Sequence, residues 1–149
     1  MAIARGAGTE VIRTAMFEDI DYTNQKLIIG EQHHIYTVLS IVIFCQAVQA
    51  AGNQINVQIT GYDSKAGTTA QVTKLFRWQA VANDTFVWND KFYFNGYEPT
   101  NFTGPLDDAT KQNAIADQGS GVSQWLYANT THADDSFEVI ITYIDQNNA

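Results

Sequence analysis

The most apolar stretch of the chain, IYTVLSIVIFCQ, runs from Ile35 to Gln46. As a helix it would rise only about 18 Å, whereas a membrane span needs roughly 30 Å, or about 20 apolar residues. Its Ile, Val, Tyr, Thr and Phe residues favour a strand over a buried helix. We therefore predict a strand, and because neither of its faces is polar, we expect both faces to be covered.

Strand alternation divides this segment between two faces. One face takes the odd-numbered residues from Ile35 to Cys45, and the other takes the even-numbered residues from Tyr36 to Gln46. We predict that the second face is covered by a sister subunit or a capsid, and that aromatic residues of later strands are buried in the same kind of contact. The residues that we assign to this contact are Tyr36, Val38, Val42, Phe44, Trp78, Trp88 and Tyr93.

Short strand signals continue along the chain. In INVQITGY (residues 55–62) and SFEVIITYID (residues 136–145), apolar and polar residues alternate, and turn residues separate the segments. Seven or eight such strands predict an all-β fold, an antiparallel β-sandwich or a barrel. Residues 25–149 would form this single domain, with an insertion at about 95–118 that holds one short helical segment. We expect residues 1–24 to form an N-terminal arm or an extended segment.

Charge and cysteine content exclude several classes of function. The net charge of −8 would repel phosphate backbones, so we expect no nucleic-acid partner. Only 16% of residues are charged, a low share for a monomer and consistent with surface hidden in an assembly. The single cysteine, Cys45, excludes an internal disulfide and is expected to be a buried thiol. The N-terminus has no apolar signal-peptide region, and we expect no membrane partner.

No set of catalytic residues emerges from the sequence. His33 and His34 are neighbours that point to opposite faces of a strand, so they bind one metal only if a symmetric oligomer gathers them at its axis. The motif HADD (132–135) is most simply a turn, with metal binding as the alternative. Asp107 and Asp108 suit the start of the short helix, with a catalytic carboxylate pair as the alternative. We therefore expect no enzyme activity, no cofactor and no metal.

The aromatic residues allow two interpretations. Most large aromatic side chains are buried in a core or a subunit contact, and Trp78 and Trp88 would then pair across neighbouring strands. Exposed aromatic side chains between Trp78 and Tyr97 would instead bind sugars or a partner protein.

Four motifs in this order resemble small virion proteins of tailed bacteriophages: HHIYTVLSIVIFCQAV, INVQITGY, DTFVWNDKFYF and FEVIITYID. The resemblance covers roughly residues 32–145. It implies a β-sandwich of jelly-roll type, commonly trimeric, that is attached to the phage particle as a decoration protein, fibre base or tail accessory. Relative to the simple pattern, the segment 95–118 looks like an insertion.

From the resemblance we predict a capsid decoration or cement protein that stabilises the phage head by non-covalent contacts. Its expected partners are the major capsid protein and sister copies in a homotrimer. Its expected location is the capsid surface of the virion, after assembly in the host cytoplasm. The alternative is a tail or head-fibre component that binds a host-surface glycan through the aromatic residues and the 95–118 loop.

Overall fold

The chain folds as an all-β antiparallel sandwich, which confirms the predicted fold class. The computed structural model describes residues 6, 8–62, 70–99, 109–110, 112–113, 118 and 121–148. The strands in these ranges are β1 (Thr9–Ile20), β2 (Gln25–Ile29), β3 (His34–Ala47), β4 (Gln54–Tyr62), β5 (Ala70–Gln79), β6 (Thr85–Trp88), β7 (Phe92–Asn95), β8 (Tyr97–Pro99), β9 (Gly121–Ser123), β10 (Trp125–Thr130) and β11 (Ser136–Asn147).

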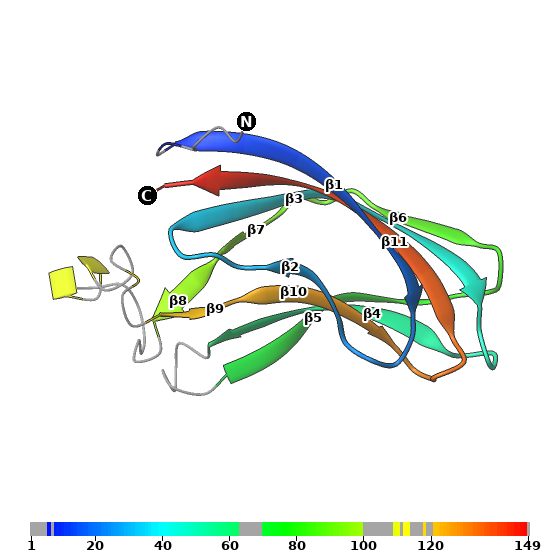
Figure 1. Cartoon of the computed structure of the whole chain (residues 1–149). Coiled ribbons are helices and arrows are strands. Elements are labelled where there is room, and N and C mark those ends of the chain that lie inside the picture. Colours follow the sequence, from blue (N-terminus) through cyan, green and yellow to red (C-terminus); the bar gives the residue numbers. More distant parts are fainter. Residues whose placement is uncertain are drawn as a thin grey trace.

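Strands from the two halves of the chain pair in a nested order. β1 pairs with β11, β2 with β10, β3 with β6 and β7, and β4 with β5. Successive pairs alternate between two sheets. Sheet A has the order β1-β11-β3-β6, with β7 also on β3, and sheet B has the order β2-β10-β4-β5. Figure 1 shows sheet A above sheet B. This nested, alternating order is that of a jelly roll.

The core lies between the two sheets. Ile55 and Val57 of β4 are fully buried, as are Phe137, Val139 and Ile141 of β11. The alternation predicted for these two strands is therefore confirmed. Cys45 is also fully buried, as expected for a small apolar side chain.

Trp78 and Trp88 lie in different sheets, Trp78 on β5 and Trp88 on β6. The Trp78 ring stacks on Phe86, with ring centroids 5.6 Å apart, and the Trp88 ring stacks on Phe76 at 5.4 Å. Each pair joins the two sheets across the interior. This corrects the prediction that the tryptophans pair on neighbouring strands, because the chain changes sheet between β5 and β6.

Half of the N-terminal segment belongs to sheet A. Within residues 1–24, for which we predict an arm or an extended segment, β1 pairs with β11 from Thr9 opposite Asn147 to Ile20 opposite Phe137. Its inward residues Ala15 and Phe17 pack against the core. Residues 9–20 are therefore an integral strand, and the sandwich begins well before residue 25.

A β-bulge in β3 changes which residues face the core. Ser40 lies opposite Thr142 and Val38 lies opposite Tyr143, so Leu39 is an extra residue without a partner on β11. The inward face therefore takes Tyr36 and Val38 before the bulge, and Ile41, Ile43 and Cys45 after it. This corrects the simple alternation predicted for residues 35–46.

The predicted insertion is described only in part. Residues 109–110 and 112–113 are helical, and β8 pairs with β9 as a separate two-stranded ribbon. Of the other residues of the predicted short helix, Gln118 is described and is not helical, and the rest, including Asp107 and Asp108, lie outside the described residues. Among the residues that are described, no helix has the length and apolar character needed to cross a membrane.

Candidate functional site

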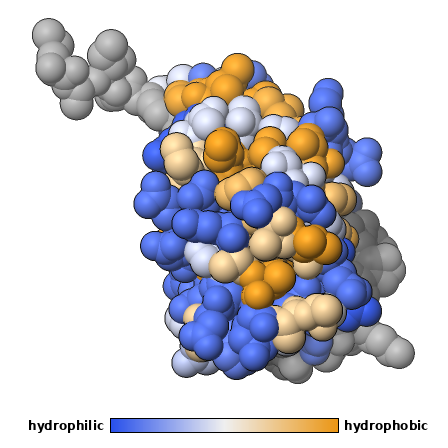
Figure 2. Space-filling view, turned by 90° about the vertical axis from the view of Figure 1, so that its right-hand side faces the viewer, coloured by the Kyte–Doolittle hydropathy of each residue, from blue (hydrophilic) through white to orange (hydrophobic). Residues whose placement is uncertain are grey.

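The outer face of sheet A carries two apolar rows that cross the sheet. In the first row, Met16 lies opposite Ile140, Ile140 opposite Val42, and Val42 opposite Val87. Met16 is 63% exposed and Val87 is 50% exposed. Since this face points away from sheet B, none of these side chains contributes to the core. Figure 2 looks from the right-hand end of Figure 1 and shows hydrophobic surface along the top, on the sheet A side, with further hydrophobic patches lower in the view.

The second row lies four residues further along β1 and β11. Ile12 lies opposite Ile144, Ile144 opposite Thr37, and Thr37 opposite Tyr93. Ile12 is 68% exposed and Tyr93 is 61% exposed. Two exposed apolar rows on one sheet leave apolar surface in water, and contiguous surface of this kind marks a contact site in folded proteins.

Uncharged hydroxyl side chains separate the two apolar rows. Thr14 lies opposite Thr142, and Thr142 lies opposite Ser40. The hydroxyl oxygens of Thr14 and Thr142 are 3.3 Å apart, within hydrogen-bond distance. Because these hydroxyl groups satisfy each other, burying this row costs less than burying isolated polar groups.

Carboxylates border the outer face of sheet A. Glu10 and Glu18 lie on β1, on either side of Met16 and Ile12, and Glu138 lies on β11 opposite Phe44. The one Lys or Arg within the strands of sheet A is Arg13. Its guanidinium carbon lies 5.9 Å from the centre of the inward-facing Tyr143 ring. The outer face therefore has an apolar centre and an acidic border.

Three of the predicted contact residues lie on this outer face: Val42, Phe44 and Tyr93. Tyr36 and Val38 instead lie in the core, 3% and 0% exposed, because the bulge at Leu39 reverses the alternation before it. This corrects their assignment to a subunit contact.

The other two predicted contact residues, Trp78 and Trp88, are partly buried and pack against the core. Sequence reasoning missed Ile12, Met16, Val87 and Ile140. The signal for them was alternation in β1, β6 and β11, where they occupy the positions between the inward residues.

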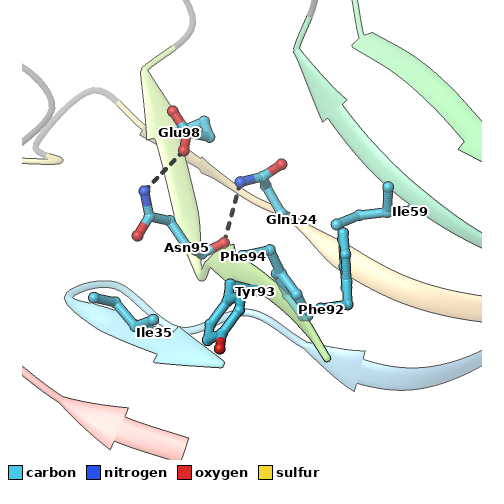
Figure 3. Close-up of a pocket in the computed structure, with 8 residues that line it drawn as sticks. All are labelled: Ile35, Ile59, Phe92, Tyr93, Phe94, Asn95, Glu98 and Gln124. Carbon is cyan, nitrogen blue, oxygen red and sulfur yellow. Dashed lines mark hydrogen bonds between the residues drawn. The ribbon is translucent and has the colours of Figure 1, made fainter. Parts of the chain in front are cut away.

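A second feature is an open groove of about 420 Å³ beside β7, the edge strand of sheet A (Figure 3). Its lining combines three aromatic rings and two isoleucines with three side chains that carry an amide or a carboxylate. The lining residues are Ile35, Ile59, Phe92, Tyr93, Phe94, Asn95, Glu98 and Gln124. Tyr93 therefore lies at the border between the groove and the outer face of sheet A.

Hydrogen bonds hold the polar side chains of the groove. Asn95 Nδ2 donates to Glu98 Oε1 at 3.0 Å, and Gln124 Nε2 donates to the Asn95 carbonyl oxygen at 3.1 Å. The segments at Gly30 and Gly96 touch backbone to backbone just behind them, and a Cβ at either glycine would overlap the other segment. Only glycine permits this close approach, which fixes where β7 gives way to β8.

His34 pairs with two carboxylates. His34 Nδ1 lies 2.6 Å from Asp145 Oδ1, and His34 Nε2 lies 3.4 Å from Glu31 Oε2. This arrangement joins the start of β3 to the end of β11. Among the described residues, no group of three or more His, Cys, Asp or Glu side chains could hold a metal ion. Burial raises the pKa of the Cys45 thiol, and the charges of Asp135 and Asp84 raise it further.

No protein-family model and no curated relative matches this sequence. The structure is similar to a subunit of Bacillus endospore appendages, described as a family of disulfide-linked pili. That likeness has 11% identity and a TM-score of 0.39, and it covers 100% of this chain and 97% of that one. The structure is also similar to a chain of the T13 viral particle of IBDV. This second likeness has 12% identity and a TM-score of 0.29, and it covers 99% of this chain and 37% of that one. At these values neither likeness bears on function.

Proposed function

We propose that this protein is a virion structural protein, a capsid decoration protein that attaches to major capsid subunits through the outer face of sheet A. The observation that supports this role is the pair of apolar rows across that face, because they leave water only when a partner covers them. The proposal needs no catalytic group, cofactor or metal. It places the protein on the capsid surface.

The chemistry of the face defines the partner that would fit it. A matching capsid surface would be apolar at its centre, to cover Met16 and Ile140, and basic at its border, to meet Glu10, Glu18 and Glu138. Burial of the apolar rows would supply the affinity at about 25 cal/mol per Å². The charged border would select the partner and its orientation more than it would tighten binding.

The proposal is tested by adding purified protein to expanded capsids of the phage that encodes it, and then measuring co-sedimentation and capsid melting temperature. Wild-type protein should bind and raise the melting temperature of the capsids. The variant Ile140→Lys places a charge in the middle of the first apolar row and should reduce binding at least about tenfold.

A matched control for this variant is Val81→Lys. Val81 is 67% exposed but lies in the turn between β5 and β6, away from sheet A's outer face. It should leave capsid binding unchanged. Capsids that neither bind the wild-type protein nor gain thermal stability from it would refute the decoration role.

The groove beside β7 favours a second candidate function, a tail or head-fibre component that binds a host-surface glycan. Aromatic rings beside amide and carboxylate groups are suited to the apolar faces and hydroxyl groups of a sugar.

On a glycan array, wild-type protein should bind and Tyr93→Ala should not. Tyr22→Ala, which removes an exposed tyrosine from the β1–β2 turn, should bind like wild type. A silent array excludes this candidate.

A further inference from the structure

The two sheets of the sandwich carry opposite charge. None of the four strands of sheet B contains an Asp or Glu residue, and together they hold Lys26, Lys74 and Arg77. All three cations are exposed. The strands of sheet A instead hold carboxylates and the single cation Arg13. In a chain of net charge −8, a sheet without any carboxylate is a distinct surface.

The register places the three cations on the outer face of sheet B. Lys26 lies opposite Tyr127, Tyr127 opposite Gln58, and Gln58 opposite Lys74. These residues alternate with core residues of the same strands, so they point away from sheet A. Lys26 Nζ lies 4.0 Å from the centre of the Trp125 ring, a cation–π contact that holds this ammonium group on the face.

Apolar and amide side chains occupy the rest of this face. In one row Ile29 lies opposite Trp125, Trp125 opposite Thr60, and Thr60 opposite Val72. Ile29 and Val72 are both more than half exposed. A second row, on the other side of the row that holds Lys26 and Lys74, consists of Asn129, Asn56 and Arg77. Within it, Asn56 Nδ2 donates to Asn129 Oδ1 at 3.3 Å. The face thus combines an apolar row with cations at its borders.

Charge decides which faces of two copies can meet. Two sheet A faces would bring the carboxylates of Glu10, Glu18 and Glu138 against one another, and two sheet B faces would do the same with the cations. Like charges across a contact cost free energy, whereas opposite charges favour it. One sheet A face on one sheet B face matches carboxylates with cations and apolar rows with an apolar row.

We propose that the outer face of sheet A of one copy packs on the outer face of sheet B of the next copy. The inference rests on the proposed use of sheet A's outer face as a contact surface. The contact is heterologous, and the two faces lie on opposite sides of the sandwich (Figure 1). Repetition therefore builds an open stack and does not close a ring.

The size of the faces predicts a weak contact. By strand geometry, the outer face of sheet A is about 14 Å wide and about 27 Å long, or about 400 Å² in flat projection. A stable standard contact buries about 800 Å² on each partner. Self-association should therefore depend on protein concentration and weaken as salt screens the charges. A copy attached to a capsid through sheet A would still present sheet B to the next copy.

The test uses two charge-reversed variants of the full chain in sedimentation velocity. One carries Lys26→Glu, Lys74→Glu and Arg77→Glu on sheet B, and the other carries Glu10→Lys, Glu18→Lys and Glu138→Lys on sheet A. Each variant alone should self-associate at least about tenfold more weakly than wild type. The first variant is acidic on both outer faces, and the second is basic on both. An equimolar mixture should therefore recover association, because in a stack in which the two variants alternate every interface joins an acidic face to a basic face.

A control pair, Asp90→Lys with Lys91→Glu, reverses charges that lie between β6 and β7 and should leave association unchanged. Thermal melts confirm that each variant is folded before it is compared.

A wild-type protein that stays monomeric at high concentration and low salt overturns the inference, and so does a closed trimer that is insensitive to salt. Failure of the mixture to recover association also overturns it. Capsid binding without self-association would overturn this inference and leave the decoration role intact. Self-association without capsid binding would overturn the decoration role and leave this inference intact.

Discussion

At the scale of single residues, Asp135 joins two turns at one end of the sandwich. Its Oδ1 accepts hydrogen bonds from the Gln49 backbone N–H at 2.8 Å and from Asn53 Nδ2 at 3.0 Å, and its Oδ2 accepts one from the His132 backbone N–H at 3.0 Å. Burial by itself would raise the pKa of Asp135, but these hydrogen bonds outweigh burial and lower it. The folded state therefore favours the charged carboxylate.

The lowered pKa has a defined consequence for stability against pH. The contribution of Asp135 is complete above the pKa of the unfolded state, near 4, and is lost as the pH falls through the lower folded pKa. Asp135→Asn replaces an acceptor oxygen by an amide donor, so it should lower the free energy of unfolding at neutral pH by about 2 kcal/mol. It should also flatten the loss of stability at acidic pH. Urea unfolding at several pH values measures both effects.

The control for this prediction is Asp134→Asn. The Asp134 side chain is 80% exposed, and its removal should change the free energy of unfolding by less than about 0.5 kcal/mol. Equal losses in the two variants would show that the hydrogen bonds of Asp135 contribute nothing specific.

At the scale of strands, the bulge at Leu39 decides which side of β3 meets the core. Deletion of Leu39 removes the unpaired residue and leaves Tyr36, Val38 and Ile41 facing inward in regular alternation. The variant should therefore remain folded. Deletion of Val42 in the same strand instead shifts every residue on one side of it to the opposite face. That variant should lose most of the roughly 5–15 kcal/mol that stabilises a domain of this kind.

Circular dichroism melts compare the two deletions, each of which removes one apolar residue from β3. A Leu39 deletion that unfolds the protein as completely as the Val42 deletion would contradict the proposed role of the bulge.

The same strand shows what sequence could predict and what it could not. Alternation correctly predicted the inward faces of β4 and β11, and the apolar character of residues 35–46 correctly predicted a strand. Of its two faces, both expected to be covered, the inner one is buried in the core, and cover on the outer one stays a prediction. Side-chain type could not locate the bulge, because Val38 and Leu39 are equally suited to the core, and only the pairing with β11 shows which of them is the extra residue. The opposite charge of the sheets was also hidden, since it appears only when Lys26 and Lys74, 48 positions apart in the sequence, are assigned to the same sheet.

At the scale of the whole molecule, the nested pairing makes the fold depend on which strands meet rather than on where the chain begins. β1 and β11 are antiparallel neighbours, with Thr9 opposite Asn147, and the Gly8 N–H donates to the Asn147 carbonyl oxygen at 2.5 Å. A linker of about three residues between Asn148 and Gly8 would therefore close the chain as a hairpin loop does. New ends can then be opened in an exposed turn without cutting a paired strand.

A circular permutant that begins at Asn83 and ends at Ala82, in the exposed β5–β6 turn, should fold to the same sandwich and unfold cooperatively in a thermal melt followed by circular dichroism. A second permutant, opened between Ile140 and Ile141, cuts β11 where it lies between β1 and β3. Because this cut removes the continuous strand that both neighbours need, the second permutant should show no cooperative transition. If the first permutant were also unable to fold, the order of strands along the chain, and not only their pairing, would be required to form the two sheets.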